Sequence, residues 1–321
     1  MAASTSEQYR NFAEKYARGT SPTYERLAHT VAADSAMIEL IDQLPPLKRQ
    51  PNLLFGAARY LGGPVGDPAA FSDWVRDHWT EVSDVMRNRR TQTNEAGRCA
   101  VLLPVLAQLP QPLALLEVGA SAGLCLYPDV YRYRYGAHVV GPASGPVELA
   151  CAVKGDVPLP EQVPTVTWRA GLDLNPIDLT DDDALRWLDA LIWPEHHERS
   201  ARLHAAAAAI RSDPPDIRRG DLLTDLPALA AEAPADATLV VFHSAVIAYV
   251  DPTARATFES AVRQLPGHWI SNESLNVFPH ITAQARLPAD AAGSFLLALD
   301  GHPVALTEQH GRSITWLGPS A

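Results

Sequence analysis

The sequence has few cysteines, no excess of positive charge and no long hydrophobic run. Its cysteines, Cys99, Cys125 and Cys151, are scattered and odd in number, which argues against a disulfide framework or a zinc motif and predicts reduced core residues. The formal net charge of −11 argues against a basic surface for nucleic-acid phosphates. No run reaches the roughly 18 apolar residues of a membrane-spanning helix, and the N-terminus lacks a signal peptide's apolar core. We expect a cytoplasmic protein without nucleic-acid or membrane partners.

What is present is an ordinary globular composition and a helical first third. Hydrophobic residues make up 47% and charged residues 20% of the 321 positions, enough length for one large domain or two smaller ones. The chain opens with a capping-box spacing in which Ser4 precedes Glu7. Residues 1–110 then place apolar side chains three and four positions apart, without strand-like alternation. We expect an N-terminal helical cap over 1–110, with its last helix over 93–109.

From residue 111 short apolar runs alternate with helical segments. The run LALLEV at 113–118 is typical of a strand covered on both faces. Alternation of strands and helices predicts right-handed crossovers and a mostly parallel sheet, and three short runs at the end of the chain predict an antiparallel edge. We therefore expect an α/β domain over 111–321. The expected strands are 113–118, 166–170, 216–220, 238–244, 267–274, 294–301, 302–311 and 312–318, and the expected helices are 123–134, 182–211, 223–233 and 252–264.

The segment Gly119-Ala120-Ser121-Ala122-Gly123, after the first expected strand, has two interpretations. It has the GxSxG spacing of a serine hydrolase's nucleophile elbow. With Glu117 before it, it is also close to the glycine-rich loop that ends a nucleotide-binding strand. A hydrolase needs an earlier oxyanion loop, and no HG-type segment precedes residue 119. The position after the first strand favours the nucleotide loop, with Glu117 accepting hydrogen bonds from an amine or a sugar hydroxyl. Candidate hydrolase bases are His243, His280, His302 and His310.

Acidic residues end three later strands: Asp173, Asp221 and Glu273. Parallel strands bring such residues to one edge of the sheet, where ligands bind. Asp173 follows the glycine loop by about fifty residues, whereas the acid of a dinucleotide fold follows by about twenty, which argues against an NAD dehydrogenase. Each acid also has a purely structural interpretation as a helix cap or turn residue.

This layout resembles the class I S-adenosylmethionine-dependent methyltransferase superfamily over 111–321. The shared features are E-x-G-x-x-x-G after the first strand, an acid after the second, Gly-Asp after the third and a closing antiparallel hairpin. A finer set of motifs resembles a bacterial family of unknown function, which has this methyltransferase-like fold preceded by helices. That resemblance implies a Rossmann-like fold but no established reaction. The motifs are TNEAGR (93–98), LLEVGASAG (115–123), GLDLNP (171–176), IWPEHHER (192–199) and VVFHSAV (240–246).

The superfamily resemblance implies S-adenosylmethionine as cofactor. The loop glycines would lie beside its methionine part, Asp173 would hold the ribose and Asp221 would lie near the adenine. The sequence departs from the superfamily by placing Ser121 where a glycine is common, and by the long crossover before Asp173. The implied cofactor-binding residues are Glu117, Gly119, Ala120, Ser121, Gly123, Asp173 and Asp221.

The end of the fourth expected strand faces the reactive methyl group in such enzymes. There His243 is a candidate base, with Ser244 and Tyr249 as hydrogen-bond partners. The structural alternative is a strand-end histidine bonded to the backbone.

Polar residues elsewhere supply the remaining candidates. We expect Glu95 and Arg98, one helical turn apart, to act in catalysis and Asn94 to contact substrate. The alternative is a capping cluster with a surface ion pair. Trp193 and Arg199 are candidate substrate contacts together with Glu273, although core packing and a surface charge would explain the first two. His196 and His197 are adjacent on an expected helix, which argues against a metal site.

The sequence thus predicts an enzyme that binds S-adenosylmethionine and a small-molecule substrate. Methyl transfer, or another reaction of the same cofactor, is the first interpretation. Two alternatives stay open: a serine hydrolase with Ser121 as nucleophile, and a non-catalytic protein with a degenerate cofactor site.

Overall fold

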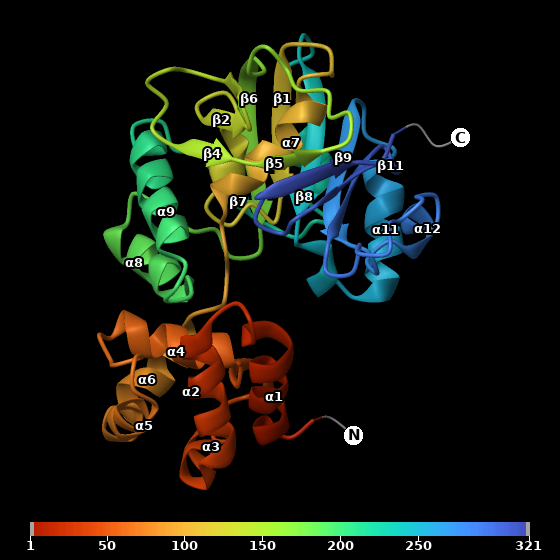
Figure 1. Cartoon of the computed structure of the whole chain (residues 1–321). Helices are drawn as coiled ribbons and strands as arrows, with labels where there is room; N and C mark the ends of the chain where they lie inside the picture. The colour runs from red at the N-terminus through yellow and green to blue at the C-terminus, as the bar shows by residue number, and fades with distance from the viewer. Residues whose placement is uncertain (1–2, 319–321) are drawn as a thin grey trace. The chain divides into compact units, whose positions relative to one another are not determined.

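The computed structural model describes residues 3–318, which form two compact units (Figure 1). One unit contains the residues up to Thr93 and a later segment, Asp181–Ala201. The other contains Asn94–Thr180 and everything from Arg202 onward. The sequence interpretation drew its boundary at residue 110. In the structure, the segment 94–110 groups with the sheet, and 181–201 groups with the N-terminal helices.

The first unit is helical because its segments begin at good caps and present one apolar face. Ser4 forms the expected capping box with Glu7, and Ser21, Asp34 and Asp67 accept backbone N–H groups at later helix starts. Its elements are α1 (Thr5–Phe12), the π-helical turn η1 (Ala13–Ala17), α2 (Pro22–Ala33), α3 (Ser35–Ile41), η2 (Pro46–Lys48), α4 (Pro51–Tyr60), α5 (Pro68–Asp77), α6 (Trp79–Asn88) and α8 (Asp182–Leu191).

An aromatic cluster forms the core of this unit. The ring of Phe55 lies 4.8 Å from that of Tyr24 and 6.0 Å from that of Phe12, measured between centroids. Trp193 packs against both Phe12 and Tyr24, and its indole N–H donates to Asn52 Oδ1 at 3.0 Å. Trp193 therefore has the structural role that its sequence alternative proposed.

The second unit is an α/β structure built on a mostly parallel nine-stranded sheet, as expected. Its strand order is β5-β12-β11-β10-β9-β8-β1-β6-β7. β1 is buried along its whole length, which explains its continuous apolar run. The antiparallel tail is also confirmed. The parallel strands are β1 (Leu113–Val118), β6 (Val166–Asp173), β7 (Asp216–Arg219), β8 (Thr238–Ser244) and β9 (His268–Ser274), and the tail strands are β10 (Phe295–Leu299), β11 (His302–Thr307) and β12 (Ser313–Trp316).

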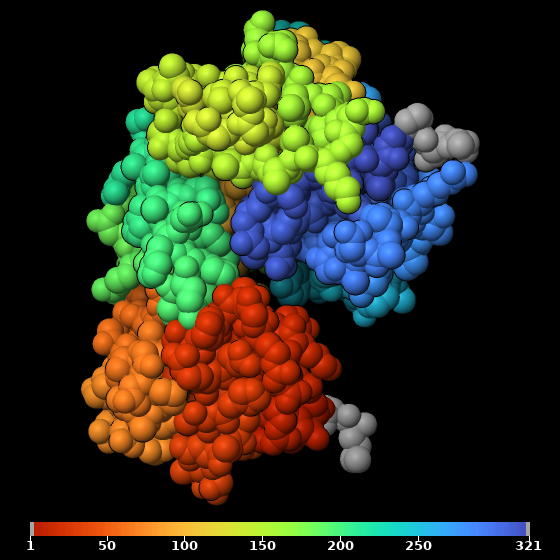
Figure 2. All heavy atoms as spheres, in the orientation of Figure 1, coloured from red at the N-terminus to blue at the C-terminus, as the bar shows by residue number. Residues whose placement is uncertain are grey.

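The segment after the glycine loop was predicted wrongly. The helix expected over 123–134 is only a 3-10 turn, η4 (Leu124–Leu126), and the chain then enters β2 (Arg132–Tyr135). β2 pairs with β3 (His138–Val140) and β4 (Glu148–Ala150) in a separate sheet. β5 (Ala152–Lys154) pairs with β12, so it forms the outer edge of the large sheet; Figure 2 shows the two segments side by side. Strands of three or four residues are too short for a detectable alternation.

Helices cover both faces of the large sheet. α11 (Pro252–Val262), α12 (Pro279–Thr282) and α10 (Leu226–Ala230) pack over a core that includes Val118 and Trp269. α7 (Cys99–Leu106) is buried along its whole length, and α9 (His197–Ile210) begins after Pro194, which divides the expected helix over 182–211. In the part of the chain that the structure describes, no helix is long and apolar enough to cross a membrane.

Candidate ligand site at the strand switch point

The sheet changes its direction of growth between β1 and β8. The chain runs from β1 to β6 and β7 on one side, then returns to β8 and β9 on the other. Glu117 in β1 is paired with Gly171 in β6 and Phe242 in β8, so it lies beside this switch point. In open α/β sheets, ligands bind beyond the strand ends at such a point. A ligand site is therefore expected at the turns that follow β1 and β8.

The turn after β1, residues 119–123, is here called the ligand loop, and it is strained. Gly119, Ser121 and Gly123 all have positive φ angles, 69°, 52° and 72°. A Cβ atom on Gly119 would lie 2.5 Å from Val246, and one on Gly123 would lie 2.7 Å from Pro215, so only glycine fits there. Ser121 adopts the left-handed conformation despite its side chain, which is uncommon and concentrated at functional sites.

Side chains on both sides hold the loop in this shape. Asn94 donates from Nδ2 to Ala120 O at 3.1 Å and accepts the Leu124 N–H at 2.8 Å. Asp173 accepts the Ser121 N–H at 2.8 Å on one oxygen and the Asn175 N–H at 2.7 Å on the other. The carboxylate that was expected to hold a ribose thus supports the loop backbone.

Two buried polar atoms of this region have no hydrogen-bond partner: Glu117 Oε2 and Ser121 Oγ. Each residue is 4% exposed. Burial raises the pKa of Glu117 well above its usual value of 4.5, the neighbouring Cys125 raises it further, and Arg98 offsets part of this shift. Since buried polar groups are nearly always bonded, such atoms require an explanation, and a polar ligand supplies one.

A buried cation lies close to Glu117. Arg98 is 8% exposed, and its guanidinium donates to Gln309 O and Ser244 O, both at 3.0 Å. Both partners are backbone carbonyls, which carry no full charge. The Arg98 charge acts on Glu117, as the opposing effect on the pKa of that carboxyl shows. The Glu117 carboxyl in β1 and the Arg98 guanidinium, which is bonded to the last residue of the paired strand β8, thus both lie beside the switch point.

Ser244 completes this face of the sheet through a chain of side-chain hydrogen bonds. Its Oγ accepts from Asn272 Nδ2 at 2.9 Å, and Asn272 Oδ1 accepts from the Thr307 hydroxyl at 2.7 Å. Sequence reasoning missed Asn272 and Thr307. An asparagine inside the otherwise apolar strand 268–274 was the available signal, because a buried amide needs partners.

His243, the expected base, lies on the opposite face of the sheet from Glu117. Its neighbour Phe242 is in register with Glu117, and successive strand residues alternate faces. The ring is fully buried: Nδ1 donates to Glu273 Oε1 at 2.8 Å, and Nε2 accepts from Trp269 Nε1 at 3.0 Å. Both ring nitrogens are engaged within the core, so neither is open to a substrate.

Glu273 supports the turn that follows β8. Its Oε1 accepts the N–H groups of Val246 and Ile247 at 2.9 and 3.0 Å in addition to that of His243, while its Oε2 has no partner. The turn includes Ala245, whose φ is 59°. Glu273 and His243 together stabilise this second strained turn, which packs against Gly119 through Val246.

The other predicted residues are placed as follows. Asn94 and Glu95 precede the 3-10 turn η3 (Ala96–Arg98) instead of lying on a helix: Glu95 is extended, and its carboxylate caps Gly97 N–H. Asp221 is an exposed turn residue that accepts Leu223 N–H at 2.8 Å, and Tyr249 is 90% exposed. Arg199 belongs to the first unit, where it contacts His196 Nδ1 at 3.3 Å.

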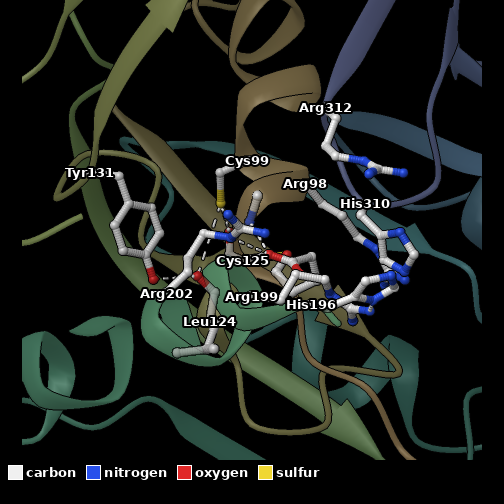
Figure 3. Close-up of polar contacts among 12 residues, drawn as sticks. Arg98, Cys99, Leu124, Cys125, Tyr131, His196, Arg199, Arg202, His310 and Arg312 are labelled. Atoms are coloured by element: carbon white, nitrogen blue, oxygen red, sulfur yellow. Dashed lines mark hydrogen bonds and ion pairs between the residues drawn. The ribbon is translucent and has the colours of Figure 1, made fainter. Parts of the chain in front are cut away.

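Ten of the predicted site residues, all in the second unit, lie around the ligand loop. The structure also adds contacts that no motif indicated. The Tyr131 hydroxyl donates to Leu124 O at 2.9 Å, and the Cys99 thiol donates to Cys125 O at 3.6 Å (Figure 3). The Cys125 thiol donates to Glu95 O at 3.4 Å. The predicted residues that gather there are Asn94, Glu95, Arg98, Glu117, Gly119, Ala120, Ser121, Gly123, Asp173 and Ser244.

Comparison with known proteins gives the family. Residues 6–316 match the model of a family described as "uncharacterized protein conserved in bacteria" (DUF2332). The chain belongs to this family. No curated protein and no solved structure matches it. The expected resemblance to a bacterial family of unknown function is therefore confirmed, and no comparison supports the methyltransferase superfamily.

This DUF2332 chain has a pocket of about 360 Å³ next to the ligand loop. Ala122 of the loop lines it together with the segments 176–180 and 214–217, and the lining combines apolar side chains with the charged Asp178, Arg211 and Asp216. The volume is within the range of small-molecule sites, about 300–1,000 Å³, but Glu117, Ser121 and Arg98 are not part of its lining. Among residues 3–318, no group of three or more His, Cys, Asp or Glu side chains is placed to hold a metal ion.

Proposed function

We propose that this protein is an enzyme that binds S-adenosylmethionine at the switch point and transfers its methyl group to a small molecule, or uses the cofactor in another reaction. The observation that carries the proposal is the pair of unpartnered buried atoms, Glu117 Oε2 and Ser121 Oγ, beside a strained glycine loop. Strain and unsatisfied polar groups both cost stability, and they persist where function requires them.

The charges of the site fit this cofactor. S-adenosylmethionine carries an ammonium, a carboxylate and a sulfonium; Glu117 would pair with the ammonium and Arg98 with the carboxylate. Ser121 Oγ would add a hydrogen bond. Asp173 and Asp221 are outside the proposal, because the first bonds the loop backbone and the second lies in an exposed turn.

The protein's part in such a reaction would be alignment. When bound, the cofactor supplies a methyl group attached to positively charged sulfur, and methyl transfer needs an acceptor held in line with that bond. The ligand loop and Glu117 would fix the donor end. His243 has no part in proton removal, since both of its nitrogens are engaged in the core. The small-molecule acceptor is left open.

Calorimetric titration with S-adenosylmethionine and S-adenosylhomocysteine tests the proposal. We expect binding of at least one ligand, and Glu117→Ala should weaken it about tenfold or more because a charge-assisted hydrogen bond is lost. Glu232→Gln, which changes an exposed glutamate paired with Arg218, is the control and should bind normally. Failure of both ligands to bind the folded wild-type protein would rule out the cofactor.

A serine hydrolase is the second candidate, and one observation favours it: Ser121 is a left-handed serine in GxSxG. Its Oγ has no hydrogen-bond partner, so no histidine activates it in this structure. A fluorophosphonate probe separates the two candidates. Covalent labelling of Ser121 would favour the hydrolase over the cofactor-binding enzyme. An unlabelled folded protein would favour the cofactor-binding enzyme. A non-catalytic protein would instead show ligand affinity without any turnover.

A further inference from the structure

One side chain, Asn94, bonds Ala120 of the ligand loop and Leu124, the residue that follows the loop. Its Nδ2 donates to Ala120 O at 3.1 Å, and its Oδ1 accepts Leu124 N–H at 2.8 Å. Ala120 O also accepts the Gly123 N–H at 2.7 Å, which closes the loop on itself. Because the two polar atoms of one amide are fixed relative to each other, Asn94 fixes the separation of Ala120 and Leu124. Ser121, in its left-handed conformation, lies between them.

The residue after Asn94 fixes this segment in turn. Glu95 is 4% exposed, and its Oε1 accepts Gly97 N–H at 2.9 Å and Arg202 Nε–H at 2.7 Å. The Glu95 carbonyl accepts from the Cys125 thiol at 3.4 Å, just beyond the loop. The residue that follows Asn94 is therefore fixed through both its side chain and its backbone carbonyl.

These residues lie where the chain enters the second unit. Asn94 is the first residue of the second unit after the chain leaves the first, and Arg202 is the first residue after the chain returns. Both entry points are thus joined by the Glu95–Arg202 ion pair, and one of them bonds the ligand loop directly.

We propose that Asn94 is a positioning residue for the ligand loop, held in place by the Glu95–Arg202 ion pair at the two entry points of the chain. It keeps Ser121 and the loop amides in the conformation that binds the ligand, and it touches no reacting atom. This inference rests on one part of the proposed function, namely that the loop binds a ligand. It implies that ligand affinity depends on the segments that enter the second unit.

Hydrogen exchange of the loop amides, followed by mass spectrometry without ligand, tests the positioning role. In Asn94→Ala the loop should exchange about tenfold faster, because two hydrogen bonds are lost. Asn94→Asp keeps the acceptor for Leu124 N–H and loses the donor to Ala120 O, so its exchange should be intermediate. Glu95→Gln should also be intermediate, since the charge of the ion pair is lost. Asn88→Ala, an exposed helical asparagine bonded to Asp84, is the matched control and should match the wild type.

Loop exchange in Asn94→Ala within about twofold of the wild type would overturn the proposal. If that variant does not fold, Asn94→Asp and Glu95→Gln decide by the same criterion. Titration of the same variants with S-adenosylmethionine adds a second readout: affinity should fall in the order in which exchange rises, and equal affinity in all of them would also overturn the proposal. If the wild type binds no S-adenosylmethionine, the cofactor proposal fails, while the exchange data still decide the role of Asn94.

Discussion

The turns after β1 and β8 are built alike, but their buried glutamates are bonded differently. Each contains a left-handed residue that is not glycine, Ser121 in one and Ala245 in the other, and each has a buried glutamate beside it. Beside the β8 turn, Glu273 accepts three hydrogen bonds on one oxygen. Beside the β1 turn, Glu117 has a buried oxygen without a partner, and so does Ser121. One glutamate uses its oxygen to support its turn, and the other keeps a buried oxygen without a partner.

This difference teaches that a buried carboxyl at a strand end is not by itself a functional signal. What distinguishes Glu117 is the combination of an unpartnered oxygen, an unpartnered hydroxyl nearby and the close charge of Arg98. Glu273 shares only the first of these. The comparison also places His243 with the supporting turn, since its Nδ1–H is one of the three donors to Glu273.

The largest expected effect is on the supporting turn. Glu273→Ala removes the acceptor of three buried N–H groups and should lower the free energy of unfolding by about 3 kcal/mol or more, because each orphaned donor carries a desolvation cost. Urea denaturation followed by circular dichroism measures it. Glu259→Ala, at a partly exposed ion pair with Arg263, should cost no more than about 1 kcal/mol. If the two variants lose the same stability, Glu273 is not the support inferred here.

Glu117→Gln should change stability in the opposite direction and raise the free energy of unfolding at neutral pH. Burial raises the pKa of Glu117 above its usual value of 4.5 in the folded protein, so the folded state binds a proton more tightly than the unfolded state. Stability from this group is therefore lost as pH rises above 4.5 toward the raised pKa. Removing the charge should stabilise the protein at neutral pH by about 1 kcal/mol or more, while it weakens ligand binding.

The pH dependence of the free energy of unfolding tests whether Glu117→Gln stabilises the protein. The difference between Glu117→Gln and the wild type should be small near pH 4.5 and grow as pH rises. A ligand ammonium that pairs with the ionised carboxyl releases a proton, so affinity for the ligand should also increase with pH. A variant less stable than the wild type at neutral pH would show that Glu117 is a structural residue like Glu273.

The sequence predicted the sheet well and the site in part, for physical reasons. A strand buried on both faces has a continuous apolar run, so β1 and β8 have the bounds that were expected. The same pattern cannot tell which face a strand-end side chain occupies. His243 lies one residue from a site-facing position, and its partners Glu273 and Trp269 come from a neighbouring strand far along the chain.

The residues that hold the ligand loop were harder to predict. Asn94 was assigned to a helix because apolar residues follow it at helical spacing, but the Glu95 cap begins a 3-10 turn there instead. Its bonds to Ala120 and Leu124 depend on the way the chain returns after β1, which no local pattern encodes. Asp173, the last residue of β6, was identified correctly as a strand-end acid, yet its contact with the Ser121 amide could be seen only in the fold.

The smallest expected effect compares the two left-handed residues directly. Glycine removes the strain of a positive φ but increases the entropy of the unfolded chain, so Ala245→Gly and Ser121→Gly should each change stability by at most about 1 kcal/mol. Thermal unfolding should show similar melting temperatures for both. Ligand binding should separate them: Ser121→Gly loses a hydroxyl that has no partner within the protein, whereas Ala245→Gly loses only a methyl group. Weaker binding in Ser121→Gly alone would assign the hydroxyl to the ligand, and equal binding in both would mean that the β1 turn, like the β8 turn, is purely structural.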